Sequence, residues 1–98
     1  MDYLHKVIFV AKKLIMEDGK IYFDNYFVTV SEIAQDALVV TKANGEKENL
    51  PNSDDFYEAA EEGHYELSDG SSYENPDYIG EFIIYESDLA YEKFRENF

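Results

Sequence analysis

The sequence contains no cysteine, no tryptophan and only two prolines. Without cysteine the chain can form neither a disulfide framework nor a thiolate metal site. The longest apolar run, Val7 to Ala11, is too short to span a bilayer, and the first residues lack the pattern of a signal peptide. We therefore expect a soluble, cytoplasmic protein.

Positive charge is scarce, above all in the second half of the chain. Residues 1–50 hold 8 acids and 6 bases, a balance of −2, whereas residues 51–98 hold 14 acids and 2 bases, a balance of −12. No Lys or Arg occurs between Lys47 and Lys93. Direct binding to nucleic acid or to an anionic membrane is therefore disfavoured, because both depend on Lys and Arg side chains.

The apolar residues nevertheless predict a folded protein, with one small domain over residues 1–98. Hydrophobic residues make up 45% of the chain, and nine Tyr and seven Phe lie in clusters separated by turn residues. Disordered chains of high charge lack such clusters. A chain of this length has room for one core but not for a core and a deep cofactor cavity.

Three dipeptides predict hairpins, and the segments between them predict strands. Asp18-Gly19, Asn44-Gly45 and Asp69-Gly70 each suit a tight two-residue turn, and each lies beside β-branched or aromatic residues. Residues 26–31 alternate in the period of two that a half-buried strand shows. The run Phe82 to Tyr85 predicts a further strand, buried on at least one face.

The two ends of the chain complete the predicted fold. Residues 3–16 fit an amphipathic helix, but their β-rich run Val7 to Val10 and the turn that follows favour a strand. Ser87 and Asp88 suit the start of a helix that extends to about Glu96. We predict a mainly β protein, a small antiparallel SH3-like or related barrel or sheet with a C-terminal helix. An α+β fold with an additional helix over residues 3–16 is the alternative.

Catalytic and metal-binding motifs are absent from the sequence. There is no glycine-rich phosphate loop and no Gly-x-Ser-x-Gly motif. His64 and Glu66 could offer two ligands from one strand face, but a closed metal site needs about four. We therefore expect no cofactor, no metal and no enzymatic activity. A small hydrolase that uses clustered carboxylates is a weaker alternative. Because the chain has so many acids, the presence of two that could act as general acid and base is not evidence of catalysis.

The acids of the second half form the candidate binding surface. Most have no basic residue near in sequence, so they either keep the protein soluble or contact a basic surface of a partner protein. A groove that normally binds nucleic acid would fit, as in an inhibitor, an immunity protein or a nucleic-acid mimic. A self-associating domain that pairs through a sheet edge, as a homodimer, is the second hypothesis. The candidate contact residues are Asp54, Asp55, Glu58, Glu61, Glu62, Glu66, Asp69, Glu74 and Asp77, with Tyr57, Tyr73 and Tyr78 as exposed aromatics among them.

Overall fold

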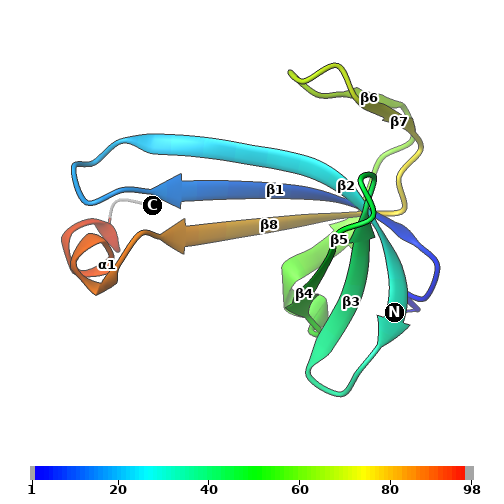
Figure 1. The fold of residues 1–98 in the computed structure, drawn as a ribbon, viewed down its shortest axis with the longest axis horizontal. Helices are drawn as coiled ribbons and strands as arrows, with labels where there is room; N and C mark the ends of the chain where they lie inside the picture. The colour runs from blue at the N-terminus through cyan, green and yellow to red at the C-terminus, as the bar shows by residue number, and fades with distance from the viewer. Residues whose placement is uncertain (1, 97–98) are drawn as a thin grey trace.

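A computed structural model describes residues 2–96 and shows a mainly β fold with one C-terminal helix (Figure 1). The elements follow in the order β1 (Val7–Ile15), β2 (Ile21–Ile33), β3 (Ala37–Lys42), β4 (Lys47–Pro51), a 3₁₀ helix η1 (Asp54–Phe56), β5 (Tyr57–Ala59), β6 (His64–Glu66), β7 (Ser72–Glu74), β8 (Tyr78–Tyr85) and α1 (Asp88–Phe94).

The N-terminal segment is a strand, so the alternative helix over residues 3–16 is wrong. β1 lies in the middle of the main sheet, antiparallel to β2 on one side and parallel to β8 on the other. Its β-branched residues Ile8 and Val10 are fully buried on the inner face of the sheet. The β-rich run of this segment pairs with a strand on each side, and these contacts outweigh its amphipathic helical pattern.

All three predicted hairpins are present, but with a longer turn than predicted. At the first, Gly19 N–H donates to Met16 O at 3.0 Å and Met16 N–H donates to Lys20 O at 2.9 Å. Gly19 takes a φ of +89°, whereas Asp18 is not among the residues with positive φ. This pattern is a type I turn closed by a glycine bulge, not a two-residue turn. The turns at Gly45 and Gly70 repeat the same hydrogen bonds.

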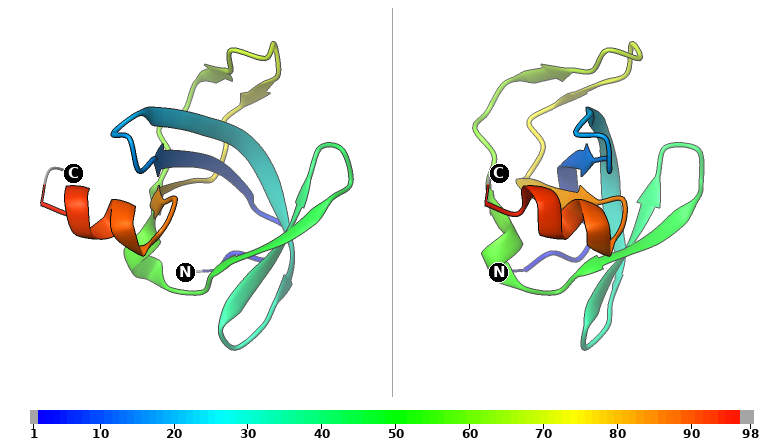
Figure 2. Two further views of the ribbon diagram at one scale, coloured as in Figure 1. Left: turned by 60° about the vertical axis from the view of Figure 1, so that its left-hand side comes forward. Right: turned by 90° about the vertical axis from the view of Figure 1, so that its left-hand side faces the viewer.

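Six strands form one strongly bent sheet in the order β4-β3-β2-β1-β8-β5, seen from three directions in Figures 1 and 2. Its pairs are antiparallel except for β1 with β8. The bend brings the two outer strands near each other, and η1 connects them. The Tyr57 hydroxyl of β5 donates to Pro51 O of β4 at 2.6 Å. A side chain therefore links the two edges, and no strand pairing between β4 and β5 occurs within residues 2–96.

The core fills the concave side of this bend. Alternate residues of β1 to β4 point inward, so the predicted alternation over residues 26–31 is confirmed. Tyr57 closes the core from β5, and Tyr3 packs on it with a centroid distance of 5.2 Å. The buried residues of the core are Tyr3, Ile8, Val10, Val28, Val30, Leu38, Val40, Leu50 and Tyr57.

The distal parts of β1, β2 and β8 extend away from this core as a three-stranded ribbon, which ends at α1 (Figure 1). The predicted helix start is confirmed, because Ser87 Oγ accepts a hydrogen bond from Ala90 N–H at 3.2 Å. The Tyr91 ring of α1 packs edge-on against Tyr85 of β8. On the ribbon the Phe82–Tyr85 run is less buried than predicted: Ile83 is 50% exposed and Ile84 is 39% exposed.

Strands β6 and β7 form a separate hairpin that projects from the main sheet (Figure 1), and we call it the arm, residues 63–75. Gly63 and Asn75 close its base, because each backbone N–H donates to an oxygen of the other residue at 2.8 Å. Tyr65 packs on Phe9 at 5.8 Å between ring centroids. This contact and that of Tyr73 with Phe27, at 5.7 Å, hold the arm against the outer face of β1 and β2.

Candidate protein-binding surface

The acidic stretch, residues 54–77, runs along one side of the molecule. In both views of Figure 2 the chain passes from η1 and β5 at the bottom of that side to the arm at the top. All of its carboxylate residues, from Asp54 to Asp77, are exposed. The sequence predicts that these acids contact a basic partner but does not indicate whether they lie on one surface. The path of the backbone brings the two halves of the stretch to the same side of the molecule (Figure 2).

The lower half of this side is an acidic groove. Asp55 of η1, Glu58 of β5 and Glu81 of β8 line it, together with Phe56 and Ile79, and its volume is about 350 Å³. Ser53 caps η1, since its side chain accepts from Asp55 N–H at 3.4 Å, and β5 with Glu58 begins directly after this short helix. Sequence analysis missed Glu81, because its place beside β5 depends on the pairing of β5 with β8.

The upper half is the arm, whose acids surround one histidine. His64 Nδ1 lies 3.2 Å from Glu74 Oε1, and His64 Nε2 lies 3.8 Å from Glu66 Oε1. The two glutamates approach different ring nitrogens, so the three side chains do not converge on one ligand position. At the tip, the hydroxyl and the backbone N–H of Ser71 both donate to Asp69, and these hydrogen bonds lower the pKa of the Asp69 carboxyl.

Two predicted contact residues hold the N-terminal segment in place. Asp77 Oδ2 accepts a hydrogen bond from Val7 N–H at 2.8 Å, at the start of β1. The Tyr3 hydroxyl donates to Asp54 Oδ1, which lowers the pKa of the Asp54 carboxyl. The sequence could not indicate these roles, because both partners lie more than 50 positions away.

The three tyrosines predicted to be exposed differ from one another. Tyr57 is only 5% exposed and belongs to the core, so this prediction is wrong. Tyr78 is half-buried, with its ring 5.1 Å from that of Tyr3, and it too offers little contact area. Tyr73 is 40% exposed on the arm and packs beside Phe27. Of these three tyrosines, only Tyr73 is therefore available as a contact residue.

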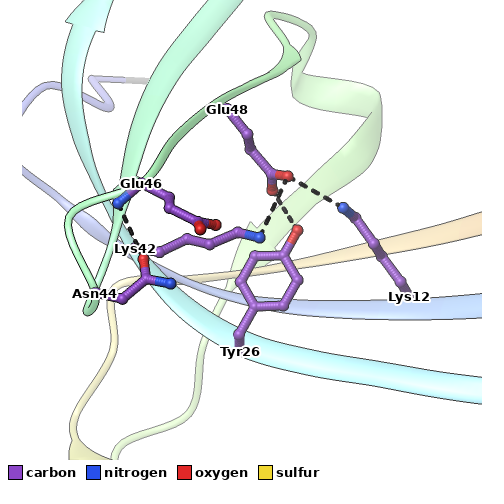
Figure 3. A network of polar contacts seen from close by, with 6 residues as sticks. All are labelled: Lys12, Tyr26, Lys42, Asn44, Glu46 and Glu48. Atoms are coloured by element: carbon purple, nitrogen blue, oxygen red, sulfur yellow. Dashed lines mark hydrogen bonds and ion pairs between the residues drawn. The ribbon is translucent and has the colours of Figure 1, made fainter.

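The lysines of the first half do not neutralise the acidic stretch. Lys12 and Lys42 both approach Glu48 Oε2, at 3.3 and 4.0 Å, and both ammonium groups lie over the ring of Tyr26 (Figure 3). The Tyr26 hydroxyl donates to the same carboxylate, and burial with this hydrogen bond raises the pKa of Tyr26. Within residues 2–96, no Lys or Arg forms an ion pair with an acid from Asp55 to Asp77.

Three further observations on residues 2–96 concern other kinds of site. Residues 2–96 contain no cluster of three or more His, Asp or Glu side chains that could hold a metal ion. The pKa values of Asp54 and Asp69 are lowered, whereas a general acid needs a raised pKa. No helix in this part of the chain is long and apolar enough to cross a membrane.

Comparisons with known proteins do not assign this surface to a family. No protein-family model, no curated protein and no solved structure matches the chain significantly.

Proposed function

We propose that the protein is a non-enzymatic, acidic binding module that occupies a basic surface of a partner protein. One observation carries the proposal: the acidic stretch follows one side of the molecule, and within residues 2–96 no Lys or Arg is paired with its acids from Asp55 to Asp77. Unpaired like charges repel one another and cost stability, which a cationic partner would offset.

The partner class that fits best is a protein with a nucleic-acid-binding groove. Duplex DNA carries one negative charge per roughly 1.7 Å of axis, and a protein must present many closely spaced carboxylates to compete with it. The exposed carboxylates from Asp55 to Glu74 would supply this negative charge. The protein would then inhibit its partner by occupying the groove, with fast association at low salt. The cytoplasm is the expected location of this activity.

Two variants with equal net charge test this proposal. In the acid-surface variant, Asp55→Asn is combined with Gln at positions 58, 61 and 62. In the matched control, Asn replaces Asp24 and Asp36, and Gln replaces Glu32 and Glu46. All eight side chains are exposed, and each variant removes four negative charges.

Affinity capture from cell extract at about 50 and about 300 mM salt would identify basic partners of the unaltered protein. We expect the control variant to retain these partners and the acid-surface variant to lose them. Duplex DNA should compete with the protein for the same partners. Equal retention by both variants would refute the proposal.

Self-association is the second candidate, and one exposed ring favours it. Phe23 of β2 is 70% exposed, and residues 21–27 of β2 pair with β1 only. Uncovered apolar strand edges are frequent sites of pairing between copies. Light scattering separates the candidates: a dimer that persists at about 300 mM salt and is lost in Phe23→Lys supports self-association.

A further inference from the structure

The outer edge of β8 is open where the ribbon leaves the core. β8 pairs with β1 over residues 78–85, but β5 covers only residues 78–80 on its other side. Within residues 2–96, no strand pairs with the outer edge of Glu81–Tyr85. An open edge presents backbone N–H and C=O groups at alternate residues, which an extended chain can bind.

The other open edges are better protected. β4 is short and contains Lys47, Glu48 and Pro51, and β5 has only three residues. The open part of β2 contains Asp24 in its middle. Charges, proline and short length are the usual ways in which proteins prevent edge pairing. The open part of β8 has four consecutive apolar residues after Glu81, so it is the least protected edge.

A groove of about 510 Å³ lies along this edge. Its apolar lining is Leu50 and Pro51 of β4, Phe56 of η1 and residues 82–84 of β8. Its polar lining is Asn49, Glu81 and Lys12, whose ammonium group is paired with Glu48 at 3.3 Å. The rings of Phe56 and Phe82 are stacked at 5.6 Å between centroids. This groove shares Phe56 and Glu81 with the acidic groove, so the two lie next to each other.

We propose that this edge binds an extended segment of the partner protein as an added β-strand. This inference rests on the proposed function and specifies which part of the partner the protein binds. The segment alternates basic and apolar residues. Its backbone pairs with β8 from Glu81 to Tyr85, its apolar side chains cover Phe56 and Phe82, and a basic side chain reaches Asp55, Glu58 and Glu81.

Charge selects this occupant over a second copy of the chain. Glu81 and Glu86 flank the open edge, and the whole chain carries a net charge of −14. Two copies paired along β8 would bring these carboxylates together, whereas a lysine-bearing strand complements them.

A labelled peptide of alternating lysine and valine tests the inference by fluorescence anisotropy. Two further peptides carry N-methyl groups, one on the odd and the other on the even positions. A strand added to an edge uses only alternate N–H groups, so we expect one of them to bind about tenfold more weakly and the other to bind normally. Equal binding of all three peptides overturns the inference but leaves the proposed function intact, because simple charge attraction ignores N-methylation.

Protein variants locate the peptide on β8. Ile84→Lys places a positive charge in the groove and should weaken binding about tenfold, whereas Ile33→Lys makes the same change at an exposed position of β2 and should leave binding within about twofold. Amide exchange should slow at residues 81–85 when the peptide is present. Equal weakening in both variants, or a dimer that the peptide dissociates, overturns the inference. If the acid-surface variant loses binding and the unaltered protein distinguishes the two N-methylated peptides, both proposals are supported.

Discussion

Gly80 is the position at which the smallest substitution should have a large effect. It lies in β8 opposite Tyr57, where the two strands pair. A Cβ at this position would lie 2.9 and 3.0 Å from two ring carbons of Tyr57 and 3.1 Å from a ring carbon of Phe82. The Tyr57 ring cannot move freely, because it packs on Tyr3 and its hydroxyl is bonded to Pro51 O.

The predicted cost of Gly80→Ala follows from these contacts. Overpacking of a rigid core costs about 1–3 kcal/mol, whereas an ordinary strand Gly→Ala change gains about 0.5–1 kcal/mol. The difference between these ranges is about 0–2.5 kcal/mol. Because three ring carbons would lie within 3.1 Å of the new Cβ, we place the cost in the upper part and expect a net loss of about 1–2 kcal/mol in the free energy of unfolding, with about 4–8 °C in Tm for each kcal/mol. Urea denaturation measures the first quantity and calorimetry the second.

A double-mutant cycle with Tyr57→Phe identifies the cause. Without the hydroxyl the ring is no longer tied to Pro51, so it can shift, and Gly80→Ala should cost about 0.5–1.5 kcal/mol less in that background. If Gly80→Ala is neutral or stabilising, or if its cost is the same in both backgrounds, the reasoning about this contact is refuted.

Three further predictions concern the pairs that hold the strands and the helix together. Glu48→Ala should lower the free energy of unfolding by about 1–3 kcal/mol in urea denaturation, because Tyr26 and two lysines lose their common acceptor; an unchanged value would contradict this role. Burial raises the pKa of Tyr57 from 10.0 to about 12, so its contribution to stability is complete below pH 10 and is lost as the pH rises through about 12. The urea midpoint should therefore fall above about pH 10, and it should fall less in Tyr57→Phe; equal slopes would contradict the assignment. Ser87→Ala should cost about 1 kcal/mol by removing the cap of α1, with faster amide exchange confined to the helix; unchanged exchange there would disprove it.

Local signals in the sequence predict most of the fold. Asp-Gly and Asn-Gly place three turns correctly because glycine alone takes the positive φ there at little cost. Ser87 marks the helix start for a similarly local reason. The position of β8 could not be predicted, since its parallel pairing with β1 joins residues about 70 positions apart. The burial of Tyr57 depends on that pairing, so its predicted exposure was wrong.

The candidate site was predictable only as a charge pattern. The absence of bases between Lys47 and Lys93 is visible in the sequence, and the structure shows where the intervening backbone runs. The roles of Asp54 and Asp77 depend on distant partners. The groove beside β8 likewise brings together β4, η1 and β8, so neither Glu81 nor Phe56 could be predicted as part of it.

The most direct test of the proposed binding surface is one comparison of affinities. The acid-surface variant and the charge-matched control are each measured for binding to the same captured basic partner. At about 50 mM salt we predict a dissociation constant raised at least about tenfold in the acid-surface variant and changed by less than about twofold in the control. The difference should shrink at about 300 mM salt. Equal affinities of the two variants at both salt concentrations would contradict the claim that this side of the molecule contacts a cationic surface.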